Sequence, residues 1–387
     1  MLDSLRVVEL GALVSAPYCT RLMADLGADV IKVEDPAGGD PSRRHGPFPH
    51  GVYDEELSGL YHYLNMNKRG VTLALEDRSD RDALLNLLDE ADVLVENLAV
   101  GYLSSLGLGY RELHERNPKL IVTSISPFGQ TGPYAGYKGE DINVCAMGGI
   151  SFSVGAPGRP PLALPLAQAS YQGALAGAAG TMAALMARRT IGHGQHVDVS
   201  CTEVFATLHQ AGAVLTFLTE GLANFRDGHR RRDTYPSTIL PCKDGYICLT
   251  GPDAGTWNRF LDMMGDPQWR HDPRFRRRRD IAENHADEVD ALVIDLLRDI
   301  TRDEFEQMCM DWKLPMAPVR LFHEVLADEQ LAARDLFAEI EVGETTVKVP
   351  GRPYAISGAQ LPRFRRAPML GEHNRELLPR ADSEVPS

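Results

Sequence analysis

The chain has 387 residues, of which 24% are charged and 43% are hydrophobic, and its formal net charge at pH 7 is −14. This length is comfortable for two domains with sizeable cores, and the composition excludes a disordered protein. The acidic balance excludes a general nucleic-acid binder, which needs a basic face, although a local basic cluster could still hold an anionic substrate.

The cysteines and the N-terminus indicate the compartment. The six cysteines form no CxxC pair and no zinc-type spacing with histidines, so we expect reduced core thiols and no metal site. The N-terminal MLDSLRVVELG lacks the pattern of a signal peptide. The uncharged run between Arg159 and Arg188 contains prolines, glutamines and glycines, which favours a buried helix over a membrane span. We therefore expect a cytoplasmic protein without membrane contact.

Residues 1–126 alternate strand and helix patterns. Short β-branched runs predict strands, and apolar periodicity predicts helices. The strands are expected at 6–10, 29–34, 70–75, 92–97 and 120–126, and the helices at 16–26 and 80–90. Such alternation predicts a parallel sheet with helices on both of its faces.

The turn after the first strand argues against dinucleotide binding. It has the sequence ELGALVSAP, with one glycine in place of the GxGxxG fingerprint. Glu34 and Asp35 end the second strand, where a ribose-binding acid would lie. Without the glycines the backbone cannot approach a pyrophosphate closely. We interpret this acid as a solvated strand end and do not expect NAD binding.

The middle of the chain continues this pattern and then changes. A helix rich in Gly and Ala, which permits close packing, is expected from Gln168 to Arg188 or Arg189. A strand at 194–200 and an apolar helix at 202–220 follow. From about residue 224 we expect a smaller α+β unit, with a hairpin about 243–245 and helices at 256–264, 283–300 and 302–312. The segment from 347 onwards returns to strand and loop.

Seven stretches resemble, in the right order, blocks of the class III CoA-transferase family, which includes formyl-CoA and carnitine CoA-transferases and α-methylacyl-CoA racemase. The stretches are RVVELGALVSAPYCTRLMADLGADVIKVEDPAGGDPSR, NMNKRGVTLAL, ADVLVENLAVG, GQTGPYAGYKGEDIN, GHGQHVDVS, LPMAPV and APMLGEHNRELL, and the resemblance covers essentially the whole chain.

The resemblance implies a fold that the local patterns do not reach. It implies an α/β chain with a Rossmann-like large domain built from both chain ends, a smaller α+β domain, and two subunits interlocked as a dimer. On this pattern residues 1–223 form the N-terminal part of the large domain with a linker helix. Residues 224–325 form the small domain, and 326–387 return to the large domain.

The resemblance also implies a mechanism. Transferases of the family use an Asp carboxylate as nucleophile on the donor thioester, and the exchange passes through mixed anhydrides and an enzyme-bound CoA thioester. The CoA thioester is a substrate, and no cofactor is bound permanently. The racemases instead use a His and an Asp for proton transfer at the α-carbon.

The catalytic acid of the family is missing from this sequence. The family Asp lies about fourteen residues before an Ala-Ala-Leu, which here is 183–185, so the position falls on Ala169, or on Ser170 in a slipped register. No Asp or Glu occurs within 158–188. A Gln or Ser side chain cannot replace a carboxylate that must form an anhydride. The racemase His aligns with Glu140, so the racemase pair is absent too.

The resemblance places CoA contacts on the first half of the chain, at Leu73, Asn97, Leu98 and Ala99. Two family arginines that attract the CoA phosphates are replaced, one by Asp35 after the second strand and the other by Ser105. The loss of two positive charges weakens the attraction for those phosphates.

Several residues have two interpretations. Glu140 and Asp141 could supply a residual acid or base, or form a hydrogen-bonded helix start, which we favour. Gln168 could line the former site or satisfy a buried backbone group. The group formed by Lys68, Arg69 and 230–232 could meet an anionic ligand, but we favour a solvated face. We interpret His373 as structural.

Three functions follow. The first is the non-nucleophile subunit of a two-subunit CoA-transferase, with an Asp-containing paralogous partner, as in the family's succinyl-CoA:benzylsuccinate CoA-transferase. Its substrates are an acyl-CoA and a carboxylic acid. The second is a homomeric isomerase or lyase that acts on a CoA thioester without covalent catalysis. The third is a CoA-binding or scaffold protein that has lost catalysis.

Overall fold

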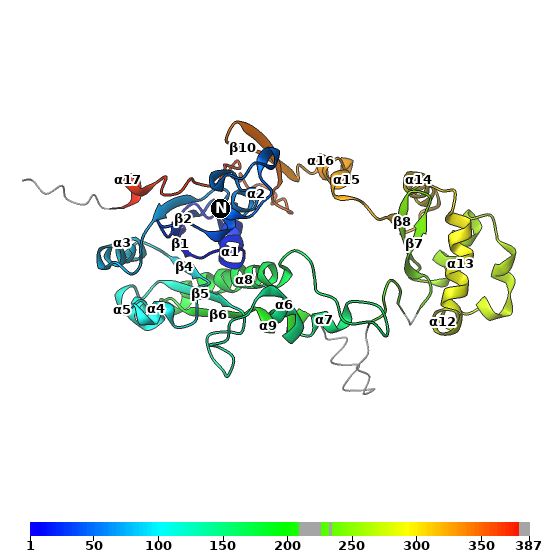
Figure 1. Cartoon of the computed structure of the whole chain (residues 1–387), viewed down its shortest axis with the longest axis horizontal. Helices are drawn as coiled ribbons and strands as arrows, with labels where there is room; N and C mark the ends of the chain where they lie inside the picture. The colour runs from blue at the N-terminus through cyan, green and yellow to red at the C-terminus, as the bar shows by residue number, and fades with distance from the viewer. Residues whose placement is uncertain (209–225, 232–233, 379–387) are drawn as a thin grey trace, which may run out of the picture. The chain divides into compact units, whose positions relative to one another are not determined.

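The computed structural model describes residues 1–208, 226–231 and 234–378 (Figure 1). The chain divides into two compact units. The first contains residues 1–151, 163–222 and 330–387, and the second contains 152–162 and 223–329. Most of the predicted helix at 202–220 lies outside the described residues; its first part is α9 (Cys201–Leu208).

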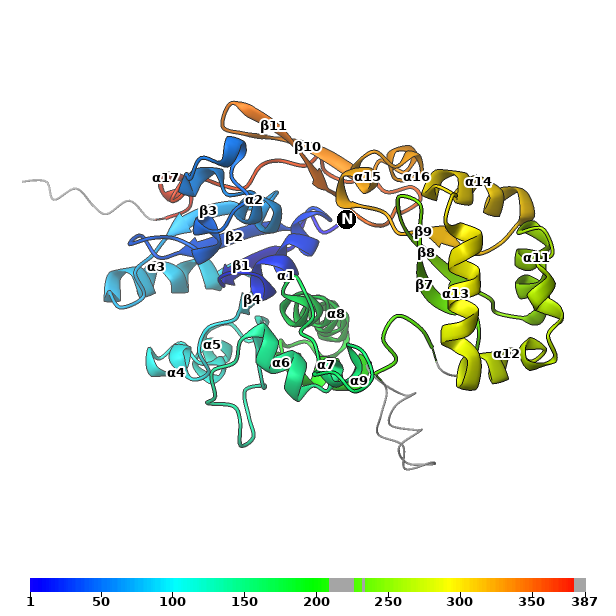
Figure 2. The ribbon, with the colours of Figure 1, turned by 45° about the vertical axis from the view of Figure 1, so that its right-hand side comes forward.

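A parallel sheet of six strands forms the centre of the first unit; Figure 1 labels β5 and β6, and Figure 2 labels β1 to β4. Its order is β3-β2-β1-β4-β5-β6, so the first strand is central and the chain reverses direction across the sheet between β1 and β4. In the parallel register Val8 of β1 lies between Ile31 of β2 and Leu94 of β4. The strands are β1 (Arg6–Leu10), β2 (Asp29–Glu34), β3 (Arg69–Thr72), β4 (Val93–Glu96), β5 (Ile121–Ser126) and β6 (His196–Ser200). The predicted parallel sheet is confirmed.

Helices cover both faces of this sheet because successive strand residues point to opposite sides. Val7 belongs to the core that contains α1 (Ser15–Ala24) and α8 (Gln168–Ile191). Its neighbour Val8 belongs to the core that contains α3 (Arg78–Asp89) and α5 (Tyr110–Arg116). The shorter helices of this unit are α2 (Gly59–Asn65), α4 (Tyr102–Ser105), α6 (Asp141–Met147), α7 (Ile150–Ser153) and α17 (Asn374–Leu377).

Glycines allow α8 to lie directly on the sheet. A Cβ added to Gly173 would lie 2.4 Å from the sulfur of Cys201, and one added to Gly177 would lie 2.8 Å from Ile125. The Gly/Ala-rich composition of the segment is therefore a packing requirement. Among the described residues no helix combines the length and the apolar character that a membrane crossing needs.

The C-terminal residues return to the N-terminal ones. The hairpin of β10 (Phe337–Val342) and β11 (Thr345–Pro350) shares a small core with Met66. Further on, the His373 ring accepts a hydrogen bond from the Gly70 amide at 3.2 Å, and the Asn374 side chain accepts one from the Thr72 amide at 2.9 Å. These contacts attach the C-terminal segment to β3.

The second unit is a smaller α+β structure. The predicted hairpin is confirmed as β7 (Ser237–Cys242) and β8 (Gly245–Thr250), with β9 (Ala317–Pro318) alongside β8. The helix expected at 283–300 begins later, because 281–285 form a turn of π-helix. The α-helices of the second unit are α11 (Ala254–Met263), α12 (Arg278–Asp280), α13 (Ala286–Leu297), α14 (Arg302–Trp312) and α15 (Phe322–Leu326), and α16 (Glu329–Ala333) lies at the boundary with the first unit along the chain.

Candidate functional site

The position at which the resemblance places the family's catalytic acid lies in the first turn of α8. Ala169 is the second residue of this helix and only 2% exposed, while Gln168 and Ser170 on either side are half-buried. Before the helix, Leu166 and Ala167 both have a positive φ, of 63° and 49°. The chain therefore enters α8 through a sharp left-handed turn, which presents the amides of the first turn.

A carboxylate from another helix meets this turn. Asp141, the first residue of α6, accepts a hydrogen bond from the Ser170 amide through Oδ1 at 3.0 Å. Its other oxygen lies 3.6 Å from the thiol of Cys145. A carboxylate at a helix N-terminus is stabilised by the free amides and by the helix dipole. The fold thus places an acid beside residue 169 although residue 169 itself is an alanine.

Glu140 has a different position. It is exposed, and its side chain and that of Asn143 form a capping box at the start of α6. The Asn143 oxygen accepts from the Glu140 amide at 3.0 Å. These contacts are those of a helix start, so of the two adjacent acids it is Asp141 that reaches α8.

Three tyrosines beside this turn were not anticipated from the sequence. The rings of Tyr18 and Tyr171 meet edge to face at 4.9 Å, and Tyr63 stacks with Tyr18 at 6.3 Å. The buried guanidinium of Arg21 lies over the Tyr63 ring at 4.1 Å. Burial raises the pKa of both Tyr18 and Tyr171 to about 12, so their hydroxyls stay protonated and can donate hydrogen bonds. Their spacing along the chain gives no indication of this grouping.

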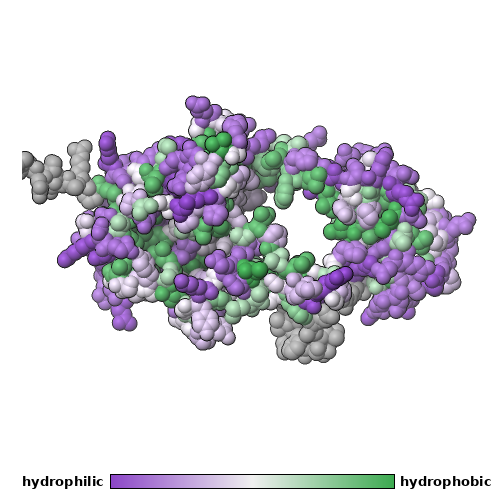
Figure 3. All heavy atoms as spheres, viewed as in Figure 1, coloured by the Kyte–Doolittle hydropathy of each residue, from purple (hydrophilic) through white to green (hydrophobic). Residues whose placement is uncertain are grey.

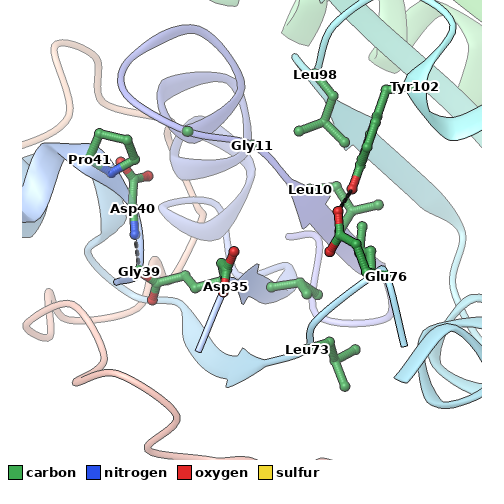
Figure 4. Close-up of a pocket in the computed structure, with 14 residues that line it drawn as sticks. Leu10, Gly11, Asp35, Gly39, Asp40, Pro41, Leu73, Glu76, Leu98 and Tyr102 are labelled. Atoms are coloured by element: carbon green, nitrogen blue, oxygen red, sulfur yellow. Dashed lines mark hydrogen bonds between the residues drawn. The ribbon is translucent and has the colours of Figure 1, made fainter. Parts of the chain in front are cut away.

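A cavity of about 260 Å³ lies at the carboxyl ends of β1 to β4 (Figure 4). Ligands of open α/β sheets bind at this edge. Of the four residues expected to contact CoA, Leu73 and Leu98 line the cavity. Asn97 instead fixes the turn after β1: its side chain accepts from the Ala12 amide at 2.9 Å and donates to the Ala12 carbonyl at 2.8 Å.

Ala99 lines a neighbouring cavity of about 120 Å³. Here the Ser124 hydroxyl lies 2.9 Å from Nε2 of His196, and Glu96 accepts a hydrogen bond from the Leu98 amide at 2.7 Å. Burial lowers the pKa of His196 and raises that of Glu96. The Glu96 carboxylate therefore holds the backbone turn that carries the expected CoA contacts at 97–99.

Buried ion pairs support the wall of the larger cavity. Glu9 of β1 accepts from Lys32 and from Lys68, each at 2.7 Å, and Lys32 also pairs with Asp40 at 2.8 Å. The cavity-lining Glu34 is paired with Arg43 at 2.8 Å and is 4% exposed, so the expected solvated strand end is wrong for Glu34, although Asp35 is exposed. Glu34, Asp40 and their cations are thus electrically neutralised within the protein.

The expectation of a solvated face is wrong for Lys68. This side chain is buried in the ion-pair network because its partner Glu9 lies on the central strand. Arg69 pairs through Nη2 with Asp29 at 2.5 Å and through Nη1 with Glu376 at 2.6 Å. Arg230 belongs to the second unit and pairs with Asp290 at 2.9 Å; Arg232 lies outside the described residues.

The remaining expectations concern single groups. Ser105, at one of the lost arginine positions, is exposed on α4 and donates to the Tyr102 carbonyl at 2.6 Å. All six cysteines are free thiols. Within the described residues, no three His, Cys, Asp or Glu side chains converge as a metal site would require.

Comparison with known proteins agrees with this architecture. The family model for CoA-transferase family III matches residues 2–374. The BbsE subunit of succinyl-CoA:(R)-benzylsuccinate CoA-transferase from Thauera aromatica is 36% identical over 377 residues, which are 94% of this chain and 90% of that protein. Succinate–glutarate CoA-transferase from Agrobacterium fabrum is 32% identical over 381 residues, covering 97% and 94%. The crystal structure of a CAIB/BAIF family protein from Brucella suis gives a TM-score of 0.88 at 31% identity and covers 97% of both chains. The chain belongs to CoA-transferase family III.

Proposed function

We propose that this chain is a subunit of a class III CoA-transferase that moves CoA between carboxylic acids, with succinyl-CoA as donor, and that it does not itself supply the nucleophile. One observation carries the proposal. The position that the family pattern gives to the catalytic Asp is Ala169, buried in the first turn of α8, and no Asp or Glu occurs between Asp141 and Asp198. Because an alanine cannot form an anhydride, an Asp-containing paralogous subunit supplies the carboxylate.

The relatives support this reaction class. The Thauera protein is named as a subunit of a transferase that uses succinyl-CoA, and the Agrobacterium protein is named for the exchange between succinate and glutarate. In this chain the cavity lined by Leu73 and Leu98 would receive the nucleoside end of CoA. The start of α8 would then face the thioester end, as part of a site that the partner completes.

The surface of α8 supports association with a second chain. Leu175 and Met186 are 45% and 72% exposed, and the exposed Ala179 and Ala183 lie between them at helical spacing. Figure 3 shows apolar side chains interrupting the hydrophilic surface of the first unit. An uncharged stripe of this kind favours a partner over water. We expect no stable monomer, and a compact species of single-chain mass in sedimentation at micromolar concentration would contradict the assembly.

A second candidate is favoured by Asp141. Its carboxylate lies at the start of α8, within 3.0 Å of the Ser170 amide, and could exchange a proton with a substrate. This would suit a homomeric isomerase or lyase that acts on a CoA thioester without a covalent intermediate. The expected transferase and this alternative differ in whether the isolated chain is active.

The test is reconstitution. The full chain is expressed alone and together with a paralogue that has Asp at the position of Ala169, and CoA transfer from succinyl-CoA to a panel of carboxylates is measured. We expect no transfer and no hydroxylamine-sensitive adduct for the chain alone, and activity for the complex. Replacing the paralogue's Asp by Ala should abolish transfer, while Glu140→Ala or Gln168→Ala here should cost less than about tenfold.

The opposite pattern would contradict the proposal. Transfer by the isolated chain, with an adduct on Glu140 or Asp141, would place the nucleophile here. Isomerisation of a CoA thioester by the isolated chain would support the second candidate. If the complex neither transferred CoA nor bound it, the remaining interpretation of this chain would be a non-catalytic scaffold.

A further inference from the structure

The lining of the larger cavity has two parts. Its apolar part comes from strand residues and the turns after them, including Leu10, Val33, Leu73 and Leu98. Such a wall suits the flat apolar face of a purine. Its polar part is acidic, and no Lys, Arg or His lines the cavity among the described residues.

Two of the four lining acids have no charge to offer a ligand. Glu34 is 4% exposed and held by Arg43, and Asp40 is 3% exposed and held by Lys32. A ligand in the cavity meets these acids as neutral pairs. The electrostatics of the open part of the cavity therefore depend on the two other lining acids.

Those two acids are exposed: Asp35 directly follows β2, and Glu76 lies in the segment after β3. Asp35 accepts from the Ala37 amide at 2.7 Å, and Glu76 accepts from the Tyr102 hydroxyl at 2.8 Å. Figure 4 shows Glu76 and Tyr102 at one side of the cavity and Asp35 between them and Asp40. Each keeps acceptor capacity for a ligand, because a carboxylate offers about four lone-pair positions.

Two guanidinium groups lie close by without lining the cavity. Arg44 donates to the Gly38 carbonyl at 2.7 Å. Arg81 donates to the carbonyls of Leu75 and Glu76, each at 2.8 Å. Both guanidinium groups are thus engaged with backbone carbonyls, in the case of Arg81 those of two lining residues. The lining itself contains carboxylates where a phosphate would require cations.

We propose that this cavity receives the nucleoside end of CoA without binding its 3′-phosphate, which contributes nothing to binding by this chain. The inference rests on the proposed function, which assigns the cavity to the nucleoside end of CoA. In dinucleotide-binding sheets an acid at the end of the second strand accepts a hydrogen bond from the ribose 2′-hydroxyl. Asp35 has this position although the glycine-rich turn is absent, and the 2′-hydroxyl of CoA is free. A phosphate dianion at the same place is repelled by Asp35 and Glu76, which are therefore the specificity-determining residues.

The experiment compares CoA with 3′-dephospho-CoA by isothermal titration calorimetry of the full chain at low ionic strength. We expect 3′-dephospho-CoA to bind at least as tightly as CoA, and up to several-fold more tightly, which is the scale of repulsion between a dianion and a carboxylate about 8 Å away in water. Asp35→Asn with Glu76→Gln should shift the ratio of the two affinities toward CoA, and Asp35→Arg should shift it further. Glu115→Gln, which removes an exposed acid from α5, should leave the ratio unchanged.

Tighter binding of CoA than of 3′-dephospho-CoA by the unmodified chain would overturn the inference. If Arg44→Gln or Arg81→Gln then removed the difference, a phosphate site built on those guanidinium groups would replace it. Binding of neither nucleotide would refute the assignment of the cavity to CoA in the proposed function, and the inference with it.

Discussion

The ion-pair network beneath the cavity should be sensitive to the loss of one acid. The network has four side chains that are each at most 4% exposed: Glu9, Lys32, Asp40 and Lys68. The two carboxylates balance the charge of the two ammonium groups. Glu9 is the only one of the four that bonds both ammonium groups. The substitution Glu9→Gln keeps the shape and leaves two buried cations with one acid. Removing one partner of a buried pair costs about 3–5 kcal/mol, and we expect a loss of this size at pH 7.

The cost should depend on pH and on charge balance. Burial lowers the pKa of Lys68 to about 8, so at pH 9 this side chain is largely neutral in the folded protein. Glu9→Gln should therefore cost less at pH 9 than at pH 7. Adding Lys68→Met to Glu9→Gln restores one acid and one base, so the double variant should recover at least about 1 kcal/mol relative to Glu9→Gln alone.

Hydrogen exchange measured by mass spectrometry localises the effect. Peptides that cover β1 and β2 should lose protection in Glu9→Gln, while peptides around Trp257 in the second unit serve as the internal control. Urea unfolding followed by circular dichroism gives the free energy. A cost below about 1 kcal/mol, or a double variant whose cost equals the sum of the two single ones, would refute the reasoning.

Three further predictions concern α8 and the sheet edge. Gly173→Ala should destabilise the protein by about 1–2 kcal/mol in urea unfolding, because the added Cβ would lie 2.4 Å from a cysteine sulfur. The control Gly136→Ala adds a Cβ in open space and should be nearly neutral. Equal costs of the two substitutions would contradict the close packing of α8. Burial lowers the folded-state pKa of His196 below its usual 6.5, so the free energy of unfolding should fall as the pH falls below 6.5. In unfolding experiments at pH 5 to 7, His196→Gln should make the free energy of unfolding depend less on pH. Asp141→Asn should lower stability by about 0.5–1 kcal/mol, because a neutral amide interacts less well with the Ser170 amide and the helix dipole; no change in melting temperature would contradict the capping role.

Local patterns predicted the helices and strands well where a few neighbouring residues determine the element. The run VLVE, buried at all four positions, is the fourth strand, and the helix at 302–312 has the predicted bounds because Thr301 and Glu304 form a capping box at its start. Both features are complete within a few residues of chain. The order of the strands is not local, and it comes from how the crossovers pack.

The interior charges show why the site could be predicted only in part. Lys68 follows an asparagine and precedes an arginine, a pattern typical of a solvated turn. It is buried because Glu9 lies 59 residues earlier on the central strand and already shares its carboxylate with Lys32, its partner in the sheet register. No pattern over a few residues contains that information. The same holds for the tyrosines, which come from α1, α2 and α8.

The start of α8 combines both cases. The resemblance to the family places the missing acid at Ala169, or at Ser170 in a slipped register. It does not show that Asp141, 29 residues before Ser170, brings a carboxylate to the same turn, because that contact depends on how α6 packs against α8. The structure also separates two acids that the sequence leaves equivalent, since the side chain of Glu140 caps its own helix while that of Asp141 bonds the next one. A carboxylate bound by a helix amide is a weaker nucleophile than a free one, because the hydrogen bond and the helix dipole stabilise its negative charge. The geometry of Asp141 therefore favours the shaping of a site over covalent catalysis, which agrees with the proposal that a second chain supplies the nucleophile.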